Sequence, residues 1–368
     1  MASPTPAPAS KFRESDFTVV TTGLEYPEGP ISMQDGSVLV CEIKSGKLTR
    51  VLPDGSKQTA AHLGGGPNGA AVGPDGAIYV CNDGGFQFFR MDSVLNTFLA
   101  GHAPPGVSPQ AAQQMMAAAA NIWITGNQAA NYKGGSIQRC DLKTGSFSTL
   151  YEGFVNASRS GPISSDLYGL KSPDDLVFDS TGGFWFTDWG KSRGRTRDVT
   201  GVLYAKADGS SINEMIFPLA SPNGIALSPD GKRLYVAETM TQRILYWNLA
   251  APGAIVPNMQ SLNGGFVLSS GLSGLPDSMT VDEQGNLYVA TILANGFLPA
   301  NGAITIISPQ GEILEEMTIT AGALPDPLPS NICFGGPDRQ TAYITLGGTG
   351  RLVSCRMRIP GLAPAFSA

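Results

Sequence analysis

Charge, histidine and long apolar runs are all scarce in this chain, and each scarcity excludes a class of protein. Only 15% of the 368 residues are charged, the formal net charge is −6, and no run of Lys or Arg occurs. The chain therefore lacks the basic surface that holds a polyanion, and we expect no nucleic-acid partner. No apolar stretch approaches the roughly 18 uninterrupted residues of a membrane span, so we expect no membrane partner either.

The few histidines and cysteines limit the catalytic and metal-binding chemistry that these residues could provide. Two histidines leave few bases for a Ser-His-Asp triad, and no G-x-S-x-G motif is present. The five cysteines are widely separated and contain no C-x-x-C pair, so we expect reduced thiols rather than a zinc cluster or a disulfide framework.

The two ends of the chain are predicted to be tails. Residues 1–10 are rich in Pro, Ala and Ser and carry neither the basic nor the apolar part of a secretion signal. We therefore expect a cytoplasmic protein with a flexible tail over residues 1–15 and a short C-terminal tail over residues 363–368.

Turn-forming residues are abundant, and they recur within one short sequence phrase. The 46 glycines and 27 prolines indicate many short strands. A Pro or Ser precedes an acidic or amide residue, a short apolar strand, an Asp-Gly type of turn and a second strand. Six copies of this phrase occur, and their polar residues are Glu28, Asn68, Asp174, Asn223, Asp277 and Asn331.

The spacing of these copies predicts an all-β, six-bladed β-propeller over residues 16–362. One step, from Asn68 to Asp174, is about twice as long as the others, which indicates a lid insertion in blade 2 over residues 88–133. Within it, residues 109–120 follow Ser108 as a plausible N-cap and predict a helix. A strand at residues 17–20 is expected to pair with residues 351–354 and close the ring.

The repeated polar residues point to a cation. In a propeller the turns before the innermost strands face one mouth of the central channel, so these six oxygen donors should converge there. Such a set needs a compensating divalent ion, and mixed amide and carboxylate donors suit Ca²⁺ best, with Mg²⁺, Mn²⁺ and Zn²⁺ as alternatives.

Four segments resemble the senescence-marker-protein/gluconolactonase family: Pro27-Glu28-Gly29-Pro30, Pro173-Asp174-Asp175-Leu176, Pro222-Asn223-Gly224-Ile225 and Pro276-Asp277-Ser278. The resemblance spans about residues 23–361 outside the lid. It implies a six-bladed propeller with one divalent metal held by Glu28, Asn223 and Asp277, and a substrate-facing Asn68. Where the family usually carries Asn, this chain has Asp174, which keeps an oxygen donor and adds a charge.

The resulting hypothesis is a metal-dependent hydrolase that opens a small lactone. The cation would polarise the carbonyl, and a carboxylate would position or activate water. Asp277 is the preferred base, Asp174 is its competitor, and His102 in the lid is a third candidate. Substrate contacts are predicted at Asn68, Asn331, Phe86 and Trp123 as well as at His102.

Two other functions remain open from the residues alone. A phosphotriesterase-like or aryl-esterase activity would use the same ion on a different substrate. A non-catalytic metal-binding propeller would present its rim to a protein partner. The expected partner is a small lactone or ester, and the expected state is a monomer or a weak homo-oligomer.

Overall fold

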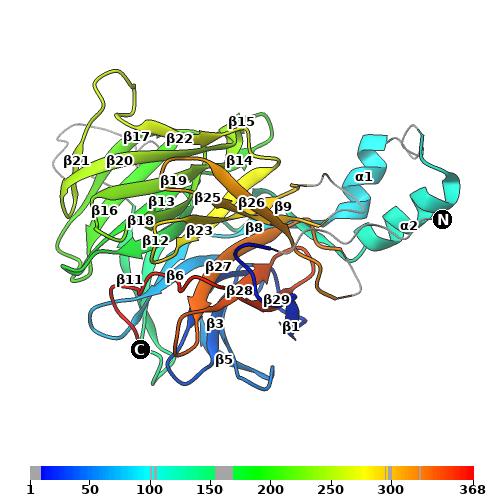
Figure 1. Cartoon of the computed structure of the whole chain (residues 1–368), viewed down its shortest axis with the longest axis horizontal. Helices are drawn as coiled ribbons and strands as arrows, with labels where there is room; N and C mark the ends of the chain where they lie inside the picture. The colour runs from blue at the N-terminus through cyan, green and yellow to red at the C-terminus, as the bar shows by residue number, and fades with distance from the viewer. Residues whose placement is uncertain are drawn as a thin grey trace.

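The structure is a computed structural model that describes residues 10–99, 102, 106–153, 169–294, 296, 301–322 and 325–368. Five four-stranded antiparallel sheets and one five-stranded sheet surround a central channel, and their innermost strands contact one another in a closed ring. Figure 1 labels the strands of these sheets. The predicted six-bladed β-propeller is therefore confirmed.

The blades follow one another along the chain, each built from its inner strand outward. Blade 1 contains β2 (Pro27–Ser32), β3 (Val38–Glu42), β4 (Lys47–Val51) and β5 (Lys57–His62). Blade 2 contains β6 (Pro67–Val72), β7 (Ile78–Asn82), β10 (Ser136–Cys140) and β11 (Phe147–Glu152). Blade 3 contains β12 (Pro173–Phe178), β13 (Gly183–Asp188), β16 (Thr200–Lys206) and β17 (Ile212–Leu219).

The second half of the ring repeats the same order. Blade 4 contains β18 (Pro222–Leu227), β19 (Arg233–Glu238), η1 (Thr239–Thr241), β20 (Arg243–Ala251), β21 (Ala254–Val256) and β22 (Phe266–Ser270). Blade 5 contains β23 (Leu275–Val281), β24 (Leu287–Ile292), β25 (Ala303–Ile307) and β26 (Ile313–Thr318). Blade 6 contains β27 (Pro329–Gly335), β28 (Thr341–Leu346), β29 (Arg351–Arg356) and β1 (Thr18–Thr21).

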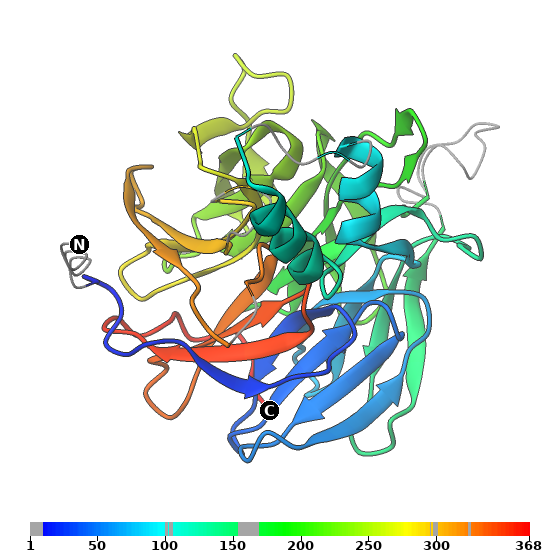
Figure 2. The ribbon, with the colours of Figure 1, turned by 90° about the vertical axis from the view of Figure 1, so that its right-hand side faces the viewer.

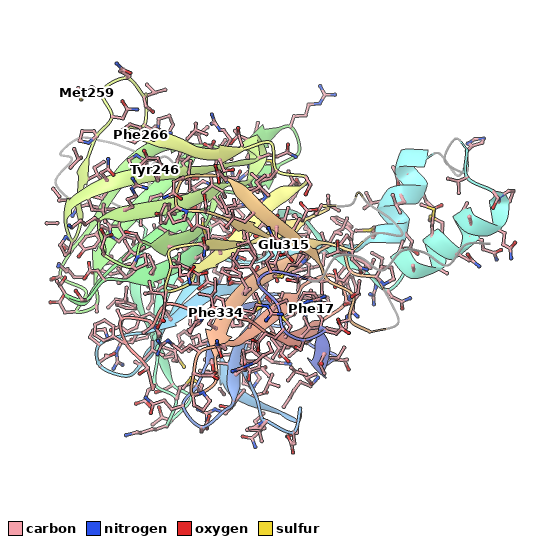
Figure 3. All side chains as sticks on the ribbon, viewed as in Figure 1. Phe17, Tyr246, Met259, Phe266, Glu315 and Phe334 are labelled. Carbon is pink, nitrogen blue, oxygen red and sulfur yellow. The ribbon has the colours of Figure 1, made fainter. Side chains whose placement is uncertain are left out.

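The composition of each strand matches how deeply the strand is buried. The second strands, such as β3 and β7, are buried along their whole length because neighbouring blades cover both faces, and they read as continuous apolar runs. Outer strands such as β5 and β11 are mostly exposed and polar. Phe17 and Phe334, labelled in Figure 3, belong to the apolar cluster that joins blades 5 and 6.

The ring is closed by strands from both ends of the chain. β1 pairs antiparallel with β29, with Thr18 opposite Ser354 and Val19 opposite Val353. This confirms the predicted closure, which leaves no unpaired edge between the first and last elements of the ring.

Four blades share a polar clamp at the end of their second strand. The last residue of β3, β7, β13 and β19 lies opposite the proline that opens the inner strand, and its side chain accepts a hydrogen bond from a backbone N–H just before that proline. The clamp residues are Glu42, Asn82, Asp188 and Glu238. Each clamp fixes the turn that leads to the mouth of the channel.

The insertion in blade 2 begins with β8 (Phe86–Arg90) and continues through α1 (Met91–Leu99) and α2 (Pro109–Ala119) to β9 (Trp123–Gln128). β8 and β9 form a two-stranded base, from which the helices project on one side of the propeller (Figures 1 and 2). The predicted helix is present as α2, and the Ser108 hydroxyl accepts a hydrogen bond from the Ala111 N–H at 3.2 Å. The helix α1 was not predicted.

The described end segments pack against the propeller. Residues 1–9 of the predicted N-terminal tail lie outside the described residues, whereas Glu14 donates its backbone N–H to Arg356 at 2.7 Å. At the other end, the Phe366 ring meets Phe178 edge-on at 5.7 Å, beside a cavity of about 670 Å³ along the inner strands.

Two simpler expectations can also be compared with the structure. All five cysteines are free thiols, as the sequence predicted. Within the described part of the chain, no helix combines the length and apolar character needed to cross a membrane.

Candidate active site

The six repeated polar residues all lie at the start of an inner strand. Each occupies the second or third position of its strand, on β2, β6, β12, β18, β23 or β27. Five of them are buried, with exposed fractions of 4–6%, while Asp277 keeps a larger exposed fraction. The sequence repeat therefore places these side chains at equivalent positions around one mouth of the channel.

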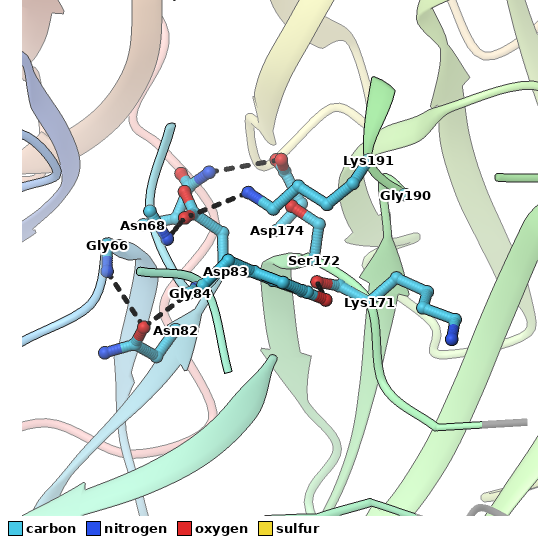
Figure 4. Close-up of polar contacts among 12 residues, drawn as sticks. Gly66, Asn68, Asn82, Asp83, Gly84, Lys171, Ser172, Asp174, Gly190 and Lys191 are labelled. Carbon is cyan, nitrogen blue, oxygen red and sulfur yellow. Dashed lines mark hydrogen bonds and ion pairs between the residues drawn. The ribbon is translucent and has the colours of Figure 1, made fainter. Parts of the chain in front are cut away.

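Hydrogen bonds join these residues across the boundaries between blades. Asn68 donates its Nδ2–H to Asp174 Oδ2 at 3.1 Å, linking blades 2 and 3 (Figure 4). Asn331 likewise donates its Nδ2–H to Glu28 Oε2 at 3.0 Å, linking blades 6 and 1. The Ser278 hydroxyl of blade 5 lies 3.3 Å from Asn223 Oδ1 of blade 4. The amide-carboxylate pairs hold the carboxylates in defined orientations.

Glycines next to the polar residues bring neighbouring inner strands unusually close together. A Cβ placed on Gly69 would lie 2.5 Å from the Asp174 carbonyl oxygen, and one on Gly224 would lie 2.6 Å from the Asp277 carbonyl oxygen. These contacts with neighbouring backbone cannot be relieved by turning a side chain. The glycine in the phrase Asn-Gly is therefore required by the spacing of the mouth, besides any role in a turn.

Burial and mutual repulsion make the mouth electrostatically strained without a cation. Burial, and then the Asp277 carboxylate, raise the pKa of Glu28 well above its usual value. Burial raises the pKa of Asp174 in the same way, and the charges of Asp277 and Glu28 raise it further. Burial raises the pKa of Asp277 to about 8. A positive charge placed among these three carboxylates would remove much of this penalty.

The donor set fits a hard cation only if amides take part. Among the described residues, no three His, Cys, Asp or Glu side chains gather closely enough to hold a metal ion by themselves. Asn68 Oδ1, however, is buried and has no hydrogen-bond partner in the described structure. A buried amide oxygen left unpaired beside carboxylates is the kind of donor that Ca²⁺ accepts in a mixed oxygen site.

The remaining predicted site residues lie in the insertion. Phe86 opens β8, and its ring meets Trp189 edge-on at 5.6 Å. Trp123 opens β9, and its ring centre lies 3.6 Å from the Arg90 guanidinium and 4.4 Å from the Lys44 ammonium. Both therefore belong to the base of the lid. His102 is exposed between the two projecting helices, outside the buried polar group at the mouth.

Sequence reasoning did not identify two charged residues beside the mouth. Asp83 and Lys191 are fully buried and form an ion pair at 3.3 Å, next to Asn68 and Asp174 (Figure 4). Asp83 directly follows the clamp residue Asn82, so a comparison of the six repeats could have identified it as an acidic residue without a clamping role. Nothing in the repeat indicates Lys191, because it lies in a connection of blade 3.

Known proteins resemble this chain in sequence over most of its length. The chain matches the "SMP-30/Gluconolactonase/LRE-like region" over residues 26–348. A gluconolactonase of Zymomonas mobilis is 26% identical over 351 residues, covering 89% of this chain and 78% of that protein. A stretch of 154 residues is 39% identical to the lactonase drp35 of Staphylococcus epidermidis, covering 41% of this chain and 44% of that protein.

Two solved structures share the fold over nearly the whole chain. A gluconolactonase of Xanthomonas campestris has a TM-score of 0.62 at 18% identity, covering 97% of this chain and 98% of that one. A calcium-binding protein, regucalcin, of Agrobacterium tumefaciens has a TM-score of 0.63 at 16% identity, covering 95% and 98%. The match over residues 26–348 includes all six polar positions, and the chain belongs to the SMP-30/gluconolactonase/LRE-like family.

Proposed function

We propose that this protein is a lactone hydrolase whose active site is the polar mouth formed by the six inner strands. The observation that carries the proposal is the cluster of buried carboxylates paired with amides at 3.0–3.1 Å, in a chain whose relatives include a gluconolactonase and lactonases. A stable fold gains nothing from buried like charges, so the cluster calls for a function.

A divalent cation, with Ca²⁺ as the first choice, fits this mouth. Glu28, Asn223 and Asp277 would hold it. Asp174 would be a third carboxylate, and no three carboxylates of the described residues gather closely enough to share an ion. When bound, such an ion supplies Lewis acidity toward a carbonyl oxygen and offsets the negative charge that develops there. The support comes from the charges that these residues impose on one another. The unpaired Asn68 Oδ1 would be left for the substrate.

The protein's own groups would handle the proton. Opening a lactone with water requires a base that accepts one proton as the water oxygen attacks the carbonyl carbon. The same group then returns the proton to the ring oxygen as the acyl C–O bond of the ring breaks. Asp277 is our choice because it is the carboxylate of the group that keeps a larger exposed fraction. Asp174 is nearly sealed and has one oxygen already engaged by Asn68. Its proposed role is to orient Asn68 toward the substrate.

The lid base would enclose the substrate. Phe86 opens β8 at the end of the hairpin nearer blade 2, and Trp123 opens β9 opposite Arg90, where the projecting helices join the hairpin. Together with Asn68 and Asn331 they would supply apolar walls and amide hydrogen bonds around a small lactone ring. In this arrangement His102, exposed between the helices, would have no part in proton transfer.

Proton release over a panel of γ- and δ-lactones, an aryl ester and a phosphotriester tests the proposal. The protein is first stripped with EDTA and then given Ca²⁺, Mn²⁺, Mg²⁺ or Zn²⁺. We expect metal-dependent lactone turnover that Asp277→Asn abolishes and Asp174→Asn only reduces. His102→Ala serves as a control and should be active. Turnover of the phosphotriester or aryl ester alone would assign a different substrate, and metal binding without turnover would indicate a binding protein.

A further inference from the structure

The buried ion pair of Asp83 and Lys191 is not explained by the propeller repeat. In four blades the last residue of the second strand clamps the turn before the inner strand, and in blade 2 that residue is Asn82. Asp83 comes one position later. At the equivalent position the other blades have uncharged residues, namely Ile43, Trp189, Thr239, Ile292 and Gly347. The charge at Asp83 therefore has no part in closing the blade.

Burying this pair is costly unless it performs some task. Both side chains are fully buried, and the Lys191 ammonium lies 3.3 Å from Asp83 Oδ1. Asp83 Oδ2 is buried without a hydrogen-bond partner in the described structure. Buried ion pairs often stabilise a fold less than apolar residues of similar size. Fold stability alone therefore does not account for the buried ion pair.

Asp83 lies between the two segments of blade 2 that carry predicted substrate contacts. Its backbone N–H donates to the Gly66 carbonyl at 2.8 Å, two residues before Asn68. Its Oδ1 accepts the Gly85 N–H at 2.5 Å, one residue before Phe86. A Cβ on Gly66 would lie 2.3 Å from the same Oδ1, so the carboxylate packs directly on the backbone there.

Lys191 links this junction to blade 3. Its ammonium lies 3.2 Å from the centre of the Phe86 ring, a close cation–π contact in a site without water access. Its backbone is fixed through Asp198, whose Oδ2 accepts the Lys191 N–H at 2.9 Å. The following hairpin, β14 (Ser192–Arg193) and β15 (Thr196–Arg197), contacts β9, and Arg193 Nε donates to Gln128 at 2.8 Å. The base of the lid is therefore attached to blade 3 at both of its strands.

The pair also borders a cavity. Asn82 and Gly84, on either side of Asp83, line a polar cavity of about 1060 Å³ together with Tyr132 of the lid base. A shift of the pair would move this wall on one side and Asn68 on the other. Its position is thus suited to affect how a substrate is held.

We propose that Asp83 and Lys191 are positioning residues of the lactonase site, which hold Asn68 and the Phe86 ring in the geometry that binds substrate. The inference rests on the proposed function and adds two residues to its site. Neither residue touches the reacting atoms. Their effect is exerted through the Gly66–Asn68 turn and through the first residue of β8.

The test uses the full-length protein with Lys191→Met alone and with Asp83→Asn and Lys191→Met together. The single variant leaves an uncompensated buried carboxylate and should lose stability, whereas the neutral double variant should recover it. If the pair only balances charge, activity returns with stability. If it positions the site, KM for lactones stays roughly tenfold to a hundredfold higher in the folded double variant, while calcium affinity is unchanged.

Lys206→Met is the matched control. This substitution removes another ammonium group near an aromatic ring. The Lys206 ammonium lies 5.3 Å from the Tyr204 ring centre, at the end of β16 that is away from the mouth. We expect its KM to equal that of the wild type. A double variant with wild-type KM and unchanged selectivity among lactones would overturn the inference.

A crystal structure of the double variant tests the geometry without relying on turnover. We expect displacement of the Phe86 ring and of Asn68. If neither side chain moves, the positioning role is rejected, whatever the activity of the wild type. A wild type that opens no lactone would instead reject the proposed function.

Discussion

Replacing Asp277 with Asn should separate the electrostatic cost of the mouth from its capacity to bind a cation. The substitution preserves the shape of the side chain and removes one ionisable carboxyl group. In the structure the charge of that group raises the pKa values of Glu28 and Asp174, so the stripped protein should become more stable without it. The same change removes a proposed ligand, so added Ca²⁺ should stabilise the variant less than the wild type.

The two effects have magnitudes that a melting experiment resolves. For 368 residues, an unfolding entropy of about 2.1 cal/mol/K per residue amounts to about 0.8 kcal/mol/K. A ligand at roughly a hundredfold over its Kd stabilises the folded state by about 2.7 kcal/mol, which corresponds to a rise in Tm of about 3–4 °C. Relief of about 1–2 kcal/mol of repulsion in the stripped protein corresponds to a rise of about 1–3 °C.

Differential scanning fluorimetry of EDTA-stripped protein, with and without Ca²⁺, measures both effects. Asp230→Asn, in the exposed turn between β18 and β19, is the control and should keep the full calcium response. An Asp277→Asn protein that keeps the wild-type calcium shift, or whose stripped form melts below the stripped wild type, would contradict the electrostatic reasoning.

Further predictions concern pH, strand spacing, the lid and ring closure. Because burial raises the pKa of Asp277 to about 8, the folded stripped protein binds more protons than the unfolded chain between about pH 4 and 8, and its urea midpoint should fall as pH rises through that window. Gly224→Ala forces a Cβ to within 2.6 Å of the Asp277 carbonyl oxygen, so it should cost roughly 1–3 kcal/mol and weaken calcium binding in titration calorimetry. Ser108→Ala removes the N-cap of α2 and should speed hydrogen exchange in that helix, at a local cost of about 1 kcal/mol, without altering the propeller core. Truncation through Thr21 removes β1 and exposes the edge of β29, so light scattering should show aggregation; a monomeric, cooperatively folded product would refute the closure argument.

The repeat in the sequence was sufficient to predict the fold. A polar residue close after Pro and an apolar strand recur six times, and an Asp-Gly or Asp-x-x-Gly turn follows in five of the copies. This local pattern dictates strand length, turn position and which end of each inner strand faces the mouth. The predicted strand pair between the two ends of the chain follows from the same count, because a closed ring needs one more strand to complete the last blade.

The lid shows where local pattern was insufficient. Ser108 and Pro109 give α2 a clear start, and it was predicted. The segment Met91–Leu99 has no comparable start signal and contains the β-branched Val94 and Thr97, yet it is helical as α1. Met91 packs against Ile122 and Leu328, so burial in this small apolar cluster outweighs weak helix propensity.

By itself, the sequence determined the blades, the closure and the six polar positions, because periodic patterns act over neighbouring residues. Only the tertiary structure decided which of these residues meet. Asn68 and Asp174 are 106 residues apart in the chain, and Asp83 and Lys191 are 108 apart, yet each pair is in contact across the boundary between blades 2 and 3. The first contact depends on the close approach of neighbouring inner strands. The second depends on how the connection that carries Lys191, outside the repeat, returns to the mouth, and no local periodicity encodes that path.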